Sequence, residues 1–240
     1  IRDCSDSEDF PGFEPVSCEN LEAACVAVRE GIADTLIAGI DYPSRDIILA
    51  CRDIIGVNGA TFSASFLFEK GEQKLIVGDC AACKNPTDEQ LYDIVLQTTA
   101  TAARLLDEEP RVALLSFSTF GSGGKDPSIE KIQAVVAKLH TEHPEILVDG
   151  EIQLDAAVNP QVALKKAPDS LVAGRANVLI APDLNSGNIL YKSLEQFGGF
   201  TAAGPILQGF KKPVSDLSRG STARDVKLVI KTMLKLALKS

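Results

Sequence analysis

Short apolar segments bounded by turn residues alternate along the chain with longer segments whose apolar residues recur every three or four positions. The short runs are typical of buried strands, and the longer spacing is typical of helices with one apolar face. Strands are predicted at residues 35–40, 61–68, 74–77, 112–117, 146–148 and 177–181.

The clearest helical pattern covers residues 88–106, where Leu91, Ile94 and Val95 begin an apolar stripe that continues to Leu105. Strands that alternate with helices of this length favour an α/β protein with a largely parallel sheet covered on both sides. Ligands bind at the open end of such a sheet. Further helices are predicted at residues 129–139, 154–165 and 224–238.

Composition agrees with a folded, globular chain. Of the 240 residues, 45% are hydrophobic and 24% are charged, which excludes a disordered or fibrous class. The formal net charge of -9 is the wrong sign for a protein that binds nucleic acid or an anionic membrane. No apolar run is long enough to cross a membrane, and the acidic N-terminal segment is unlike a signal peptide, so we expect a cytoplasmic protein. The first residue is Ile1, from which we expect that an N-terminal piece is missing.

The six cysteines all fall within the first 83 residues, which is not the distribution of a disulfide framework. Cys80 and Cys83 form a CxxC that is compatible with a redox pair or half of a zinc site. No second CxxC or nearby histidine completes four ligands, so ordinary buried or loop thiols are favoured. His140 and His143 are interpreted as residues of a solvated helix end.

A glycine-rich segment at residues 118–126 follows a predicted strand and precedes a predicted helix. Backbone N–H groups at such a position can cradle a phosphate or an oxyanion. The segment matches neither the Walker loop nor the dinucleotide-binding GxGxxG motif. A phosphate-binding turn of another kind and a simple tight strand-to-helix turn both remain open.

A second segment, residues 204–225, is predicted to be a structured loop that leads into the last helix at Ser221 or Thr222. Ser218 and Arg219 lie just before this helix, and Asp225 lies about one turn inside it. Guanidinium, hydroxyl and helix dipole together make a suitable anion site, and the aspartate can accept a proton from a nucleophile. The spacing from Thr222 to Asp225 also fits a capping box, in which Asp225 only closes the helix.

Two further segments carry polar residues with more than one interpretation. Asp149, Glu151 and Asp155 are compatible with a divalent cation site or with hydrogen-bonded loop acids. Residues 165–192 are predicted to end in a strand and a Gly-Asn turn at Gly187. The last thirty residues hold eight basic and two acidic side chains, so a cationic segment is attached to an acidic body. Such a segment favours a phosphate-bearing ligand, or it is a helix with a solvated lysine face.

Taken together, residues 110–124, 148–157, 165–192 and 204–220 resemble, in order and spacing, the phosphate acetyl- and butyryltransferase family, the phosphotransacetylases. The likeness runs from about Ile32 to the C-terminus. It implies reversible transfer of an acyl group between acyl phosphate and coenzyme A, most readily acetyl, by direct thiolate attack in a ternary complex without a metal. The resemblance implies that Asp225 takes the thiol proton, that Ser218 stabilises the oxygen that gains charge, and that Arg219 holds phosphate and carbonyl.

The resemblance also implies further residues. Cys83 stands where the family has an asparagine, so it is expected to be an incidental thiol. Many members have an arginine at the position of Leu49, and Arg45 and Arg52, at helical spacing on either side, are the candidates to replace it. The expected substrate-binding residues are Ser44, Arg45, Arg52, Thr119, Ser122, Gly123 and Gln208.

The implied fold is a three-layer α/β/α sandwich with a mostly parallel mixed sheet, similar to isocitrate and isopropylmalate dehydrogenases, with two lobes around a cleft. Residues 1–50 and 205–240 would form the remnant of the first lobe with the C-terminal helix, and residues 51–204 the second lobe. The expected partners are coenzyme A or acetyl-CoA, acetyl phosphate, inorganic phosphate and a second copy of the chain, with no metal, nucleic acid or membrane. The alternatives are a butyryltransferase and a non-catalytic, acetyl-CoA-sensing or oligomerising domain.

Overall fold

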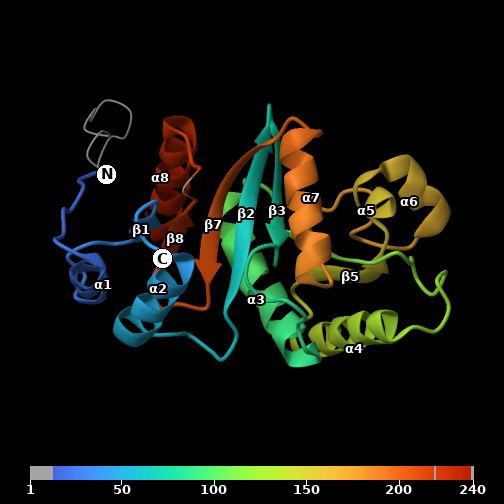
Figure 1. The fold of residues 1–240 in the computed structure, drawn as a ribbon. Coiled ribbons are helices and arrows are strands. Elements are labelled where there is room, and N and C mark those ends of the chain that lie inside the picture. The colour runs from blue at the N-terminus through green and yellow to red at the C-terminus, as the bar shows by residue number, and fades with distance from the viewer. Residues whose placement is uncertain (1–12, 219, 239–240) are drawn as a thin grey trace. The chain divides into compact units, whose positions relative to one another are not determined.

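A computed structural model describes residues 13–218 and 220–238. The chain forms two compact units (Figure 1): the first combines Ile1–Ala60 with Ala203–Ser240, and the second is Thr61–Ala202. Among the helices of the described residues, none has the length and apolar character required to cross a membrane.

The described residues of the first unit form three strands in the order β1 (Leu36–Gly39), β8 (Val214–Leu217) and β7 (Thr201–Gln208). β1 runs parallel to β8, and β7 runs antiparallel to it. Gly39 has a φ of 113°, and a Cβ atom there would lie 2.1 Å from the carbonyl oxygen of Leu217. Only glycine therefore allows β1 to approach the end of β8 this closely.

Helices of the first unit are α1 (Leu21–Arg29), α2 (Ser44–Ala50) and α8 (Ala223–Leu238), with a π-helical turn η1 (Cys51–Ile55) that continues α2. α8 begins within one residue of the helix predicted from the periodicity. Most of its predicted apolar stripe is buried: Val226, Val229, Ile230 and Met233 are each less than 9% exposed, whereas Ala237 is partly exposed.

The second unit contains five strands in the order β2 (Ser63–Lys70), β3 (Gln73–Gly78), β6 (Val178–Ile180), β4 (Arg111–Leu115) and β5 (Leu147–Ile152). β2 and β3 form an antiparallel hairpin, whereas β3–β6, β6–β4 and β4–β5 are parallel. The expected α/β class with a mostly parallel mixed sheet is confirmed.

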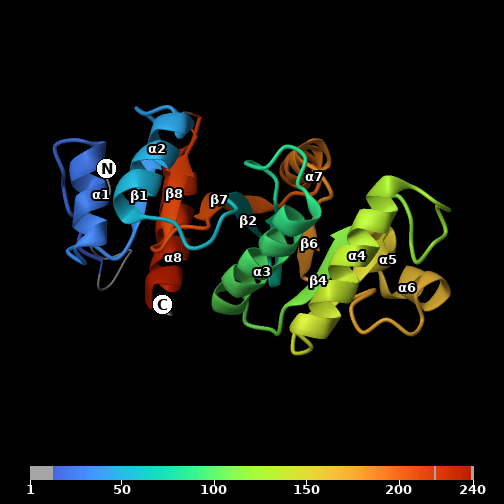
Figure 2. The same cartoon turned by 90° about the horizontal axis from the view of Figure 1, so that it is seen from below.

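Helices cover both faces of this sheet. Side chains alternate along β2: Ser63 donates to Gln97 of α3 (Asp88–Leu105), whereas Phe66 stacks on Tyr191 of α7 (Leu184–Gln196) with ring centroids 4.4 Å apart. α3 and α7 therefore lie on opposite faces. α4 (Pro127–Glu142) lies beside α3, as Figure 2 shows, whereas α5 (Leu154–Val158) packs on the same face as α7 and is followed by α6 (Pro160–Lys166).

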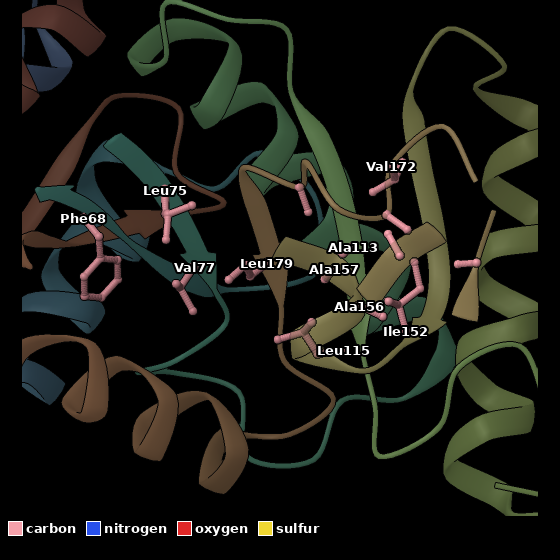
Figure 3. Close-up of a cluster of buried hydrophobic side chains, with 14 of the residues drawn as sticks. Phe68, Leu75, Val77, Ala113, Leu115, Ile152, Ala156, Ala157, Val172 and Leu179 are labelled. Carbon is pink, nitrogen blue, oxygen red and sulfur yellow. The ribbon is translucent and has the colours of Figure 1, made fainter. Parts of the chain in front are cut away.

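One core cluster of the second unit lies between the sheet and the helices α5 and α7. Figure 3 shows Phe68 and Val77 from the hairpin, Leu179 from β6 and the small side chains of α5 meeting in one cluster. Ala156 and Ala157 are fully buried, so α5 can approach the sheet closely. This packing fixes the ends of β4 and β5, from which the polar segments of this unit emerge.

The loop predicted at residues 204–225 is partly wrong, because β7 and β8 fall in this region. Gly204, Pro205 and Pro213 gave it the composition of a loop. β8 also contains two polar residues, Ser215 and Asp216, yet both are buried in the sheet. Ser215 donates a 2.8 Å hydrogen bond to the carbonyl of Pro205, which satisfies its hydroxyl inside the unit.

Two boundaries also differ from the predictions. The Gly-Asn pair at Gly187 lies inside α7, which Asp183 caps by accepting from the amide of Ser186. Gly187 is needed because a Cβ there would lie 2.3 Å from the carbonyl oxygen of Asp79. The helix predicted at residues 154–165 is divided into α5 and α6 at Asn159, because Asn159 caps α6 and Pro160 begins it.

Candidate active site

The parallel strands β1 and β8 end at the same edge of the first unit. Gly39 is paired with Leu217, and the amide of Ile40 donates a 3.2 Å hydrogen bond to the carbonyl of Leu217. The segment that leads into α2 and the segment that follows β8 therefore start side by side. This is the kind of sheet edge at which α/β proteins bind ligands.

Ser218 begins a tight turn after β8. Its carbonyl accepts from the amide of Ser221 at 3.0 Å, and its hydroxyl oxygen accepts from the amide of Gly220 at 3.3 Å. The side chain of Ser218 is exposed, so its hydroxyl hydrogen can still be donated to a ligand. Arg219, predicted from the sequence as a catalytic residue, lies outside the described residues.

Thr222 and Asp225 close the N-terminus of α8. Oδ2 of Asp225 accepts from the amide and the hydroxyl of Thr222, both at 2.8 Å, and the amide of Asp225 donates to the Thr222 hydroxyl oxygen at 3.3 Å. The capping-box interpretation is therefore confirmed. It does not exclude proton acceptance by Asp225, because an ionised carboxylate offers about four lone-pair sites.

Ser44, at the start of α2, contacts this edge of the sheet through Asp216, which was not among the predicted site residues. The hydroxyl of Ser44 donates to the carboxylate of Asp216, which is 7% exposed on β8. Burial raises the pKa of Asp216, and the bond from Ser44 opposes that rise. The signal available in the sequence was an acidic residue two positions before Ser218, in a short segment flanked by Val214 and Leu217.

The two candidate arginines occupy different ends of the helical segment that starts at Ser44. Arg45 is exposed and adjacent to Ser44. Arg52 lies seven residues further along, about 10 Å at 1.5 Å per residue, and its Nε donates to Asp53 at 2.8 Å. The segment then reaches Gly56, whose carbonyl accepts from the amide of Lys211. Ser44, the neighbour of Arg45, thus contacts Asp216 near the end of β8, whereas the segment after Arg52 reaches Lys211, which precedes β8.

Gln208 is the last residue of β7 and is 5% exposed. β7 is antiparallel to β8, with Leu207 opposite Val214, so Gln208 lies at the end of β8 where that strand begins. Ser218 follows the other end of the same strand. The structure therefore does not bring Gln208 together with Ser218 and Asp225, and a substrate contact by Gln208 stays a prediction.

The remaining predicted residues belong to the glycine-rich turn of the second unit, between β4 and α4. All amides from 118 to 124 donate within the protein: to side-chain oxygens of Ser116, Ser118, Ser122 and Glu151, and to carbonyls of Thr119, Gly121 and Glu151. An anion cradle needs amides that point to a ligand. The geometry therefore favours the tight strand-to-helix turn.

Within this turn the three predicted residues have different environments. Thr119 is 4% exposed, and its hydroxyl oxygen accepts from the amide of Gln153 at 3.0 Å. Ser122 is exposed and accepts from the amide of Thr119 at 2.9 Å. A Cβ atom on Gly123 would lie 2.8 Å from the ring of Phe117, so the turn itself requires this glycine. Ser122 is the predicted residue whose side chain is available at the surface.

The three carboxylates considered as cation ligands each have a protein partner. Asp149 accepts from the hydroxyl of Ser170 at 2.6 Å, Asp155 pairs with Lys166 at 2.8 Å, and Glu151 binds the glycine-rich turn. Among the described residues, no group of three or more His, Cys, Asp or Glu side chains is arranged to hold a metal ion.

The CxxC cysteines and the histidines also have protein partners. Cys80 is fully buried and donates weakly to the carbonyl of Val77, while Cys83 lies 3.8 Å from the Gln90 amide oxygen. The ring of His140, near the end of α4, is 2.8 Å from the carbonyl of Val148, and His143 faces Glu145.

Comparisons with known proteins agree with this architecture. A family model described as phosphate acetyl/butaryl transferase matches residues 13–233. The chain is 40% identical over 218 residues to a phosphate acetyltransferase of Clostridium acetobutylicum, covering 88% of this chain but 65% of that relative. A phosphotransacetylase structure from Streptococcus pyogenes superposes with a TM-score of 0.85 at 39% identity, covering 92% of this chain and 68% of the other.

A more distant structure shares the fold alone: 4-hydroxythreonine-4-phosphate dehydrogenase from Klebsiella pneumoniae, with a TM-score of 0.58 at 13% identity over 90% of this chain and 69% of that one. The chain spans less than two thirds of the length of the first curated relatives, from 62% to 65%. The match over residues 13–233 nevertheless includes both units and the segments at the edge of β1 and β8. The chain belongs to the phosphate acetyl/butaryl transferase family.

Proposed function

We propose that the protein is a phosphate acetyltransferase, which transfers an acetyl group reversibly between acetyl phosphate and coenzyme A. The observation that carries this proposal is the turn from Ser218 to Asp225, which places an exposed hydroxyl and a carboxylate at the N-terminus of α8 in a chain of this family. Coenzyme A is a substrate in this proposal, and no metal takes part.

Proton transfer is assigned to Asp225. A free thiol is only a few per cent thiolate near neutral pH, so a positioned base increases the fraction that can attack. Asp225 accepts the thiol proton, the sulfur forms a bond to the acetyl carbonyl carbon, and the bond from that carbon to the phosphate oxygen breaks. The phosphate leaves with the electron pair, so atoms and charge balance without a further reactant.

Ser218 is assigned to the developing oxyanion. Its hydroxyl is exposed and its oxygen already accepts from the amide of Gly220, which leaves the hydroxyl hydrogen as its remaining donor. A single donor of this kind, aimed at the oxygen that gains charge, contributes about 3 kcal/mol of transition-state stabilisation.

Binding of the phosphoryl group is assigned to Arg219 and Arg45. A guanidinium binds phosphate with two parallel hydrogen bonds and stays charged. Arg45 is favoured over Arg52 because it is adjacent to Ser44, whereas Arg52 is paired with Asp53 further along the helical segment. The positive end of the dipole of the 16-residue helix α8 adds to the attraction for an anion.

In the second unit, Ser122 is the predicted residue whose exposed hydroxyl supports a substrate contact. The amides of the glycine-rich turn are not assigned to substrate, since each donates within the protein. Thr119 and Gly123 are assigned to the turn itself. Homodimer formation and a cytoplasmic location remain part of the proposal on the strength of the family resemblance.

The test is release of inorganic phosphate from acetyl phosphate by the full-length protein, with and without coenzyme A. Thiol-dependent release that is lost in Ser218→Ala supports the proposal. Binding of coenzyme A without release would instead support a non-catalytic acetyl-CoA-sensing domain. A higher kcat/KM for butyryl phosphate than for acetyl phosphate would assign the protein to the butyryltransferases.

A further inference from the structure

The carboxylate of Glu151 occupies the interior of the glycine-rich turn. Its side chain is fully buried, and Oε1 accepts from the amide of Gly121 at 2.6 Å and from the hydroxyl of Ser118 at 2.8 Å. Oε2 accepts from the side-chain amide of Gln133 on α4 at 2.9 Å. One acidic residue on β5 thus joins the turn to the helix that follows it.

The donors to this carboxylate are neutral, so hydrogen bonds rather than a counter-ion stabilise its charge. Burial by itself raises the pKa of Glu151, but the bonds from the backbone of Gly121 and of Glu151 itself, and from the side chains of Gln133 and Ser118, outweigh burial, and the pKa lies below its ordinary value. Glu151 is therefore ionised at neutral pH. The place that an external phosphate would take in a glycine-rich turn is held by an anion of the protein.

The same residue controls the backbone at Phe120. Phe120 has a φ of 45°, in the left-handed region that bulky residues rarely adopt, and its side chain is 45% exposed. Its amide donates to the carbonyl of Glu151 at 3.1 Å, and the next amide donates to the carboxylate. Both peptide groups that flank Phe120 are thus fixed by Glu151, and such conformations persist only where the surroundings hold them.

The bonds extend from Phe120 to Ser122. The hydroxyl oxygen of Ser118, which donates to Glu151, accepts from the amide of Gly123 at 2.8 Å. Ser122 accepts from the amide of Thr119, so its side chain is also oriented by the turn. Phe120, with Asp149, Lys166 and residues 167–170, lines a pocket of about 360 Å³. Loss of the acceptor oxygens of Glu151 would release the segment that carries both exposed side chains.

We propose that Glu151 is a positioning residue: its buried carboxylate is the permanent anion of the glycine-rich turn and fixes the conformation in which the turn presents Ser122 and Phe120 to substrate. The claim about substrate rests on the proposed phosphate acetyltransferase function. The claim about the turn does not.

Three variants of the full-length protein separate the contribution of the acceptor oxygens of Glu151 from that of its charge. Glu151→Ala removes all of the acceptors supplied by the side chain. Glu151→Gln keeps one oxygen that accepts from Gly121 and Ser118. The NH₂ group introduced at position 151 then needs an acceptor, which the Gln133 side-chain oxygen supplies after a 180° rotation of that amide. The double variant E151Q/Q133E keeps an amide–carboxylate pair with the partners exchanged. Glu130→Ala, at an exposed acid of α4, is the matched control.

The first measurement is hydrogen–deuterium exchange of the amides of Gly121 and Gly123, which needs no activity. We expect Glu151→Ala to accelerate exchange at both amides by about 10-fold or more, since each loses an acceptor that Glu151 supplies or orients. Glu151→Gln, E151Q/Q133E and Glu130→Ala are expected to stay within about 3-fold of the wild type. Unchanged exchange in Glu151→Ala would overturn the proposal.

The second measurement separates positioning from loss of folded protein. We expect Glu151→Ala to raise KM for a substrate by about 10-fold with kcat within about 3-fold, and both conservative variants to restore KM. A lower kcat with unchanged KM would show that Glu151 only keeps the enzyme folded, and would overturn the positioning role. If the wild type showed no turnover, the proposed function would fail, while the exchange data would still decide the role of Glu151 in the turn.

Discussion

Thr222 and Asp225 bind each other reciprocally at the start of α8: the amide and hydroxyl of Thr222 donate to Oδ2 of Asp225, and the amide of Asp225 donates back to the Thr222 hydroxyl oxygen. The residue proposed as the base is thus also a helix cap. The carboxylate is held in one place before any substrate binds, and this pre-organisation suits a general base.

The two roles of Asp225 can be separated by two substitutions. Asp225→Asn keeps an oxygen that accepts from Thr222 but cannot take a proton, so we expect turnover to fall at least about 100-fold with a nearly unchanged melting temperature. Asp225→Ala is expected to lose turnover and also about 1 kcal/mol of unfolding free energy, because the cap is lost. Phosphate release and thermal unfolding measure the two effects. Full activity in Asp225→Asn would exclude Asp225 as the base.

The positions of the arginines predict different effects of their removal. Arg45→Ala is expected to raise the KM for acetyl phosphate by about 10-fold or more, since a charged hydrogen bond to phosphate is lost. Arg52→Ala is expected to raise it several-fold at most, because Arg52 lies further along the helical segment and is paired with Asp53. Initial rates over a range of acetyl phosphate concentrations give both values. A larger effect of Arg52→Ala would reverse the assignment.

Glu151 predicts a pH dependence of stability. Its folded-state pKa is lowered relative to the unfolded chain, so its contribution to stability is fully present above the ordinary value of 4.5 and is lost as the pH falls through the folded-state pKa. Between neutral pH and a pH below the folded-state pKa of Glu151, we expect the unfolding free energy of Glu151→Gln to fall less than that of the wild type. Urea unfolding at a series of pH values tests this. Parallel curves for the two proteins would show that Glu151 does not contribute to the acid dependence.

Gly187 predicts a large loss of stability from a single added carbon atom. A Cβ atom there would lie 2.3 Å from the carbonyl oxygen of Asp79 and 3.0 Å from Cα of Cys80, so α7 must shift away from this loop. We expect Gly187→Ala to cost about 1 to 3 kcal/mol, although alanine ordinarily stabilises a helix. Asn185→Ala, at an exposed position of the same helix, is the control and is expected to stay within about 0.5 kcal/mol. Equal stabilities of the two variants would refute the close packing.

The periodicity of the sequence was sufficient for most of the helices and strands it predicted. The stripe at residues 88–106 became α3, and each of the six predicted apolar runs overlaps a strand. It failed where tertiary contacts oppose local composition. β8 carries Ser215 and Asp216 inside the sheet because Pro205 and Ser44 supply their hydrogen-bond partners. The Gly-Asn pair at Gly187 is typical of a turn, yet Gly187 lies inside α7 because only glycine fits against Asp79.

The sequence by itself determined the α/β class, the family and the residue types of the candidate site, because these depend on spacing along the chain. It left open whether Asp225 caps a helix, which part of the first unit the segment from Ser44 contacts, and whether the glycine-rich turn has free amides. Only the tertiary structure decided these points. Each depends on which distant groups meet: the cap depends on where α8 begins, the segment from Ser44 on its bond to Asp216, and the turn on Glu151 from another strand.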